Sequence, residues 1–147
     1  MIYTNYVPHN IADLAERFGG KDAYCDFLND SFEQSIPTRF VADHGQHGSR
    51  LVDFDNQPGT GMAHLFTVSG KPWLSQTWVR QVKLKAHGDV TPYGGYHGDE
   101  DQGQMGALGV LMAIGLFQVD GGASVGNVYQ VTAPLFDRVT VELDNAY

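Results

Sequence analysis

Residues 11–34 read IADLAERFGGKDAYCDFLNDSFEQ, and this stretch contains two helical patterns separated by Gly19-Gly20. Asn10 is placed to cap the first helix, with Asp13 in a capping-box-like position. The apolar residues that share one face of this helix are Ile11, Leu14, Ala15 and Phe18. A second helix is predicted over residues 21–34. The residues expected to point inward from it are Ala23, Phe27 and Leu28. The stretch therefore predicts two helices in hairpin-like succession.

Three more helical patterns and two strand patterns follow along the chain. Helices are predicted near Met62, after Pro72 and over residues 102–116, and the last of these is apolar nearly all round. We therefore expect it to be buried on most sides. Residues 128–133 and 138–143 alternate in polarity and are rich in β-branched residues, which predicts two strands. The order indicates a mainly α fold, and paired helices of this kind suit an α/α barrel or part of one.

Composition excludes several classes of function. The 147 residues carry a formal net charge of −8, so a nucleic-acid partner is not expected. Cys25 is the only cysteine, so no disulfide can form within the chain. The apolar run over residues 107–117 is about half the length needed to span a bilayer, and the first residues lack a signal-peptide pattern. We expect a soluble chain with no membrane partner.

The most informative loop ends in Asp99-Glu100-Asp101. Three adjacent carboxylates repel one another unless a helix N-terminus or a bound Ca²⁺ compensates. Asp101 could also act simply as the N-cap of the following helix, with Gln104 completing a capping box. That interpretation explains about half of such patterns, but it leaves Asp99 and Glu100 unexplained. A second loop, over residues 38–57, is rich in Asp, His and Gly and shows no clean period, which is typical of a functional segment.

Five ordered blocks, spread over nearly the whole chain, carry a resemblance to a known family. They are Tyr6-Val7-Pro8-His9-Asn10, Asp55-Asn56-Gln57-Pro58, Gly70-Lys71-Pro72-Trp73 with Gln76, Trp78, Val79 and Arg80, Gly98 to Met105, and Ala133-Pro134-Leu135-Phe136-Asp137. In this order they resemble glycoside hydrolase family 92, the calcium-dependent exo-α-mannosidases. The resemblance implies that residues 1–118 are the C-terminal part of an (α/α)6-barrel catalytic domain. Residues 119–147 would then contribute strands of an accompanying β-domain.

The resemblance also implies an inverting mechanism that uses two carboxyl groups. Asp101 is then the candidate general base, and Asp99 matches a position that supports it. The substrate would be a mannoside or related carbohydrate. The candidate substrate-binding residues are His9, Asn10, Trp73 and His97. For His9 and His97 a plain surface role stays open, and Trp73 is a better candidate for stacking on a sugar than Trp78.

The cofactor implied by the resemblance is calcium. Its candidate ligands are Asn56, Gln57, Asp99 and Asp101. Gln57 stands where the family usually has Glu, and a neutral oxygen should hold calcium less tightly than a carboxylate. A zinc site built from His44, His47 and His64 is not expected, because their spacing matches no common ligand signature.

The resemblance places the family's general acid just before residue 1, so the isolated chain is expected to be inactive. A half barrel would also expose apolar faces, which favours self-association or pairing with the missing half of the domain. Two hypotheses follow. The chain is either part of an inverting α-mannosidase or a non-catalytic sugar-binding or oligomerising half-barrel module.

Overall fold

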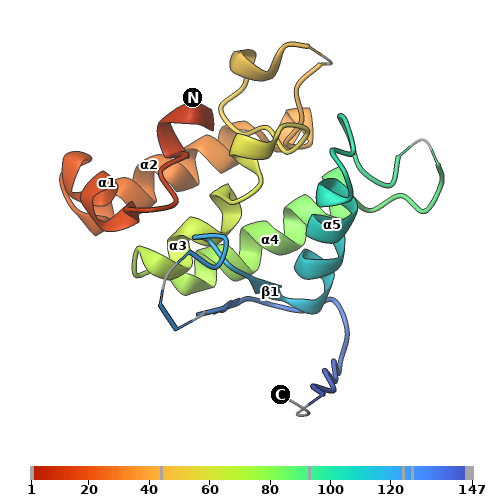
Figure 1. Cartoon of the computed structure of the whole chain (residues 1–147). Coiled ribbons are helices and arrows are strands. Elements are labelled where there is room, and N and C mark those ends of the chain that lie inside the picture. The colour runs from red at the N-terminus through yellow and green to blue at the C-terminus, as the bar shows by residue number, and fades with distance from the viewer. Residues whose placement is uncertain (1, 44, 93, 124, 127, 145–147) are drawn as a thin grey trace.

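The computed structural model describes residues 2–43, 45–92, 94–123, 125–126 and 128–144, and this part of the chain is mainly helical (Figure 1). Its α-helices are α1 (Ile11–Arg17), α2 (Lys21–Gln34), α3 (Leu65–Val68), α4 (Pro72–Ala86) and α5 (Gln104–Ile114). Short 3-10 turns lie at Ile2–Asn5, Ile36–Thr38, His47–Ser49, Gln57–Gly59 and Met62–His64. Strands β1 (Leu116–Phe117) and β2 (Gln130–Val131) pair antiparallel, with Leu116 opposite Val131. The prediction of a mainly α fold with short strands is confirmed.

The contacts between helices join α1 to α2 and α3, and α4 to α3 and α5. Figure 1 shows α1 and α2 toward one side and α5 toward the other, with α4 between them. The loop that joins α4 to α5 extends outward beside α5 (Figure 1). None of the helices in the described ranges is long and apolar enough to cross a membrane.

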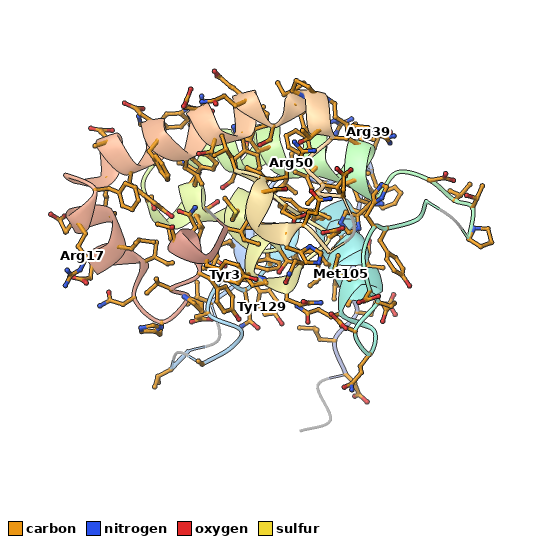
Figure 2. The ribbon with its side chains drawn as sticks, turned by 90° about the horizontal axis from the view of Figure 1, so that it is seen from above. Tyr3, Arg17, Arg39, Arg50, Met105 and Tyr129 are labelled. Atoms are coloured by element: carbon orange, nitrogen blue, oxygen red, sulfur yellow. The ribbon has the colours of Figure 1, made fainter. Side chains whose placement is uncertain are left out.

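The α1–α2 hairpin forms as its sequence predicts. The Asn10 side chain accepts a hydrogen bond from the Asp13 backbone N–H at 3.2 Å, which is the expected N-cap contact. Asp13 also pairs with Arg17 at 2.8 Å, and Figure 2 shows Arg17 at the outer end of this hairpin. Gly19-Gly20 ends α1 because both residues have positive φ (96° and 106°), which glycine adopts without steric cost.

An aromatic cluster forms the centre of the core. Phe32 of α2 stacks on Trp78 of α4, with ring centroids 5.2 Å apart. Three more buried rings contact Phe32, and they are Phe40, Phe54 and Phe66. Arg39, which follows the 3-10 turn Ile36–Thr38 after α2, donates a hydrogen bond to the Lys85 carbonyl at 2.7 Å and so ties this turn to the end of α4 (Figure 2).

The inward face of α2 differs slightly from the prediction. Leu28 is fully buried and Phe27 half-buried, but Ala23 is exposed and its neighbour Tyr24 is buried instead. The Tyr24 hydroxyl donates a hydrogen bond to the buried Asn5 side chain at 3.0 Å. This polar contact satisfies the phenol in the interior, so the large ring takes the inward position.

Helix α5 is shorter and more exposed than predicted. It begins at Gln104 rather than Gln102 because residues 101–103 all have positive φ, and it ends at Ile114, just before Gly115, which also has positive φ. The expectation of burial on most sides is wrong, since Val110 is 61% exposed. In the described contacts α5 packs against α4 and β1, so its other side faces solvent.

The C-terminal segment forms less sheet than its pattern predicts. The strand expected over residues 128–133 is shortened to β2, and the strand expected over residues 138–143 is wrong, since these residues are irregular and exposed. Alternation alone does not make a strand, because a strand also needs a partner and a face to cover. β1 and β2 lie on either side of the predicted domain boundary after residue 118, and they pair with each other. The division of the chain at this boundary stays a prediction.

Candidate active site

A cavity of about 240 Å³ brings together three of the five sequence blocks. Tyr6 and Pro8 line it from the first block, Gln57 and Pro58 from the second, and Gln104 from the acidic-loop block. Phe117 of β1 and residues 118–121, which follow it, also line the cavity. Blocks that are about 50 residues apart in the sequence therefore meet at one concave surface, which is typical of a ligand site.

The acidic loop is fixed against the second block by a close backbone contact. Gly98 has φ +73°, and a Cβ atom placed on it would lie 2.8 Å from the Cβ of Asp55 and closer still to the Asp55 carbonyl oxygen. Only glycine fits this approach and this backbone conformation together. Gly98 therefore sets the distance between the Asp55–Pro58 block and the carboxylates that follow it.

Glu100, and not Asp101, caps helix α5. The Glu100 carboxylate accepts hydrogen bonds from the backbone N–H groups of Gly103 and Gly106, the latter at 2.9 Å. The residue at the N-cap position itself is Gly103, so the interpretation of Asp101 as the cap is wrong. The Glu100 side chain is long enough to reach the N-terminus of α5, where it accepts hydrogen bonds from N–H groups that would otherwise lack partners.

The two candidate catalytic residues, Asp99 and Asp101, are both exposed. Asp101 has φ +54° and Gln102 has φ +62°, and both residues are followed by Gly103 in the same left-handed region. Two consecutive non-glycine residues in this region are costly, and such strain is often found at functional sites. The backbone thus turns sharply just where the candidate general base stands.

The predicted substrate-binding residues lie at different places. His9 is exposed before α1, and the Asn10 side chain is engaged in capping that helix. Trp73 is 57% exposed in the first turn of α4, whereas Trp78 is buried and donates a hydrogen bond to Asn29 at 2.8 Å. His97 is half-buried and lines a second, more polar cavity of about 580 Å³ together with Asp99 and Glu100. The structure thus brings His97 and Asp99 together, while His9, Asn10 and Trp73 stay predictions.

Of the four predicted calcium ligands, Gln57 and Asp99 line different cavities, and Asn56 and Asp101 are not among the residues that line either one. Asn56 immediately precedes the 3-10 turn Gln57–Gly59, and Gln57 itself lines the first cavity. Asp99 lines the second cavity, and the two loops touch where Gly98 meets Asp55. The structure therefore places the two halves of the predicted ligand set on contacting loops, and the assignment itself stays a prediction.

A cluster that the sequence did not single out lies beside this contact. Nδ1 of His47 is 2.8 Å from Oδ1 of Asp55 and 3.2 Å from Oδ2 of Asp53. Asp53 is 0% and Asp55 is 5% exposed. Asp53 and Asp55 are two positions apart in the sequence, and residues with this spacing can lie on the same face of an extended segment. The sequence signal for this cluster is the spacing of the two aspartates together with His47 a few residues before them.

Burial and mutual contact shift the pKa values in this cluster. Burial raises the pKa of Asp55 to about 6, the neighbouring Asp53 adds to the rise, and His47 opposes it. For His47, burial lowers the pKa, but the hydrogen bonds and charges of the two aspartates outweigh this effect, so the pKa is raised. The pKa shifts of His47 and Asp55 therefore arise from burial together with the same short contacts.

Among the described residues, His64 is not part of the cluster around His47. His64 is 0% exposed and stacks on Phe117, with centroids 4.0 Å apart, and its ring nitrogens have no hydrogen-bond partner among the described residues. Burial lowers the pKa of His64 to about 3. His44 lies outside the described residues. His64 is thus a neutral core residue.

The family model described as the glycosyl hydrolase family 92 catalytic domain matches residues 1–147, so this mainly helical chain is part of a catalytic domain of the glycoside hydrolase class. The chain belongs to glycosyl hydrolase family 92, as its five blocks predict. Its family therefore acts on carbohydrates. Comparison with curated proteins gave no match.

Proposed function

We propose that this chain carries the water-activating side of an inverting α-mannosidase site that acts on terminal α-mannosides. The observation that supports this most directly is that the three carboxylates of the acidic loop have different environments. Glu100 satisfies the N-terminus of α5, while Asp99 and Asp101 remain exposed to solvent. Capping therefore does not account for these two carboxylates, and both are free to contact water and substrate.

In the proposed reaction, the Asp101 carboxylate accepts a proton from a water molecule. The water oxygen then bonds to the anomeric carbon from the face opposite the leaving group, and the glycosidic C–O bond breaks. A second carboxyl group protonates the departing oxygen, and the resemblance places that acid outside the five blocks of this chain. Asp99, on the same strained loop, orients the water through its own carboxylate.

The donor set suits calcium chemically. Asn56 and Gln57 offer amide oxygens and Asp99 and Asp101 offer carboxylate oxygens, and Ca²⁺ binds oxygen ligands of these kinds. A bound calcium ion would supply a fixed positive charge that holds sugar hydroxyl groups. Because Gln57 is neutral, we expect weaker binding than a glutamate at this position would give.

The test uses α-mannosyl fluoride, because fluoride is a leaving group that needs little help from a general acid. With calcium present, we expect slow hydrolysis by the wild-type chain with β-mannose as the first product in proton NMR spectra. Asp101→Asn should reduce the rate by at least about 100-fold, whereas Glu142→Gln, which changes an exposed carboxylate elsewhere, should leave the rate unchanged. Failure of the wild type to hydrolyse the fluoride, or an equal rate in the Asp101→Asn variant, would contradict the proposal.

A specific observation favours the non-catalytic alternative as the second candidate. Several large apolar side chains are more than half exposed, namely Tyr3, Tyr6, Trp73, Leu84, Val110 and Phe136. Exposed apolar side chains that gather into one patch are typical of a face that another chain or domain covers. Saturable binding of mannose without hydrolysis of the fluoride would favour a sugar-binding module, and concentration-dependent association in sedimentation would favour an oligomerising one.

A further inference from the structure

The His47–Asp53–Asp55 cluster has the composition of a metal site. Among the described residues, it is the group of three or more His, Cys, Asp or Glu whose potential ligand atoms lie within 4.8 Å of one another. One imidazole nitrogen and two carboxylate oxygens are a donor set that suits transition ions such as Zn²⁺ better than Ca²⁺, which takes oxygen ligands.

The distances within the cluster suit a small ion. Ligand atoms about 2.0 Å from a tetrahedral Zn²⁺ are about 3.3 Å from one another. The Nδ1 atom of His47 lies 2.8 Å from Asp55 Oδ1 and 3.2 Å from Asp53 Oδ2. Since all three ligand atoms lie within 4.8 Å of one another, they can turn toward one ion with only modest movements.

Asp53 is held in place by the backbone around it. Its Oδ1 atom accepts hydrogen bonds from the N–H groups of Ala42 and Asp55, at 3.1 and 3.2 Å. Its other oxygen, Oδ2, points to His47. Outer hydrogen bonds of this kind orient metal ligands in advance.

The two buried carboxylates of the cluster would also be stabilised by a bound cation. Asp53 and Asp55 are both buried, and His47 is their basic partner in the described ion pairs. Burying carboxylates is costly unless positive charge is close. The His47 side chain is 27% exposed, which gives an ion a route from solvent.

We propose that Nδ1 of His47, Oδ2 of Asp53 and Oδ1 of Asp55 bind a divalent transition-metal ion, with Zn²⁺ as the representative ion. On binding, His47 releases any proton on Nδ1 and the metal takes its place. This site is distinct from the calcium assignment, which involves Asn56, Gln57 and the acidic loop. Because Asp55 also packs against Gly98, a bound ion would strengthen the contact between the two loops.

The experiment is a calorimetric titration of the full chain with Zn²⁺, followed by a Co²⁺ titration monitored by visible absorption. We expect one Zn²⁺ per chain, and Co²⁺ d–d bands with the intensity of a four- or five-coordinate ion. His47→Gln should weaken Zn²⁺ binding by at least about 100-fold. The matched control His9→Gln, which removes an exposed histidine elsewhere, should bind Zn²⁺ as the wild type does.

The Asp99→Asn/Asp101→Asn double variant separates this proposal from the calcium assignment. It should keep Zn²⁺ binding even if calcium binding is lost. No saturable Zn²⁺ binding by the wild type, or equal binding by the His47→Gln variant, would overturn the proposal. If His47→Gln fails to fold, the wild-type Co²⁺ titration decides, since the ring resonances of His47 must then broaden in proton NMR spectra before those of His9. Broadening in the reverse order would overturn it.

Discussion

Gly98 and Asp55 lie in direct backbone contact, and this contact joins the acidic loop to the Asp55–Pro58 block of the candidate site. A Cβ atom on Gly98 would lie 2.8 Å from the Asp55 Cβ, and Gly98 has φ +73°. The position therefore requires glycine for two separate reasons, space and backbone conformation. The arrangement of the candidate site depends on this contact.

Gly98→Ala should destabilise the chain strongly. Strain at positive φ and overlap with Asp55 add to each other, and we expect a loss of at least about 2 kcal/mol in the free energy of unfolding. Gly121→Ala is the matched control, because Gly121 has φ +64° but open space around its Cβ position. It should lose only about 1 kcal/mol. Equal losses in urea denaturation would show that the contact with Asp55 is not tight.

Glu100→Ala should remove the cap of α5. The N–H groups of Gly103 and Gly106 would lose their acceptor, so we expect a loss of about 1 kcal/mol, measured as a lower denaturation midpoint. Asp99→Ala, its exposed neighbour, should change stability by less than about 0.5 kcal/mol in calcium-free buffer. A larger effect at Asp99 than at Glu100 would contradict the assignment of the cap.

Acid should destabilise the fold through His64. In the unfolded chain His64 has its ordinary pKa of 6.5, whereas burial lowers the pKa to about 3 in the folded chain. Below pH 6.5 the unfolded chain therefore binds more protons, and stability falls as the pH falls toward 3. The slope for this one group approaches about 1.4 kcal/mol per pH unit. His87, whose pKa burial lowers to about 4, acts in the same direction.

The His64→Phe variant tests this pH dependence. A phenyl ring can stack on Phe117 and cannot be protonated, so the fall in stability between pH 6.5 and 4 should become shallower. His9→Gln should keep the wild-type slope, because His9 is exposed. Urea titrations at several pH values measure the slopes, and identical slopes for His64→Phe and wild type would contradict the account of His64.

Phe32→Ala should be among the most destabilising single substitutions. Phe32 is 0% exposed and contacts four aromatic rings, so the cavity left behind should cost about 3–5 kcal/mol. Phe136→Ala is the control, because Phe136 is 56% exposed and should cost less than about 1 kcal/mol. Similar losses at the two positions in thermal unfolding would show that the core is not centred on Phe32.

The sequence predicted the features that depend on local chemistry. The Asn10 cap and the Gly19-Gly20 stop fix the α1–α2 hairpin through contacts between near neighbours. The limits of α5 were missed because they depend on a run of left-handed residues and on which carboxylate reaches the helix N-terminus. Neither property follows from helical periodicity.

Long-range features were the hardest to predict. A strand over residues 138–143 requires a partner, and alternation in the sequence does not supply one. The His47 cluster requires the loop over residues 41–55 to fold back on itself, which brings Asp53 to the Ala42 backbone. The five family blocks, in contrast, identified the family, because each block is a set of specific residues rather than a periodic pattern.

The most direct test of the proposed site is calorimetric measurement of Ca²⁺ binding to the wild-type chain and to the Asp99→Asn/Asp101→Asn double variant. We expect saturable binding by the wild type that is lost in the double variant, and tighter binding by Gln57→Glu than by the wild type. Absence of binding at millimolar calcium, or equal binding by the double variant, would contradict the assignment of a calcium-dependent catalytic role to the acidic loop.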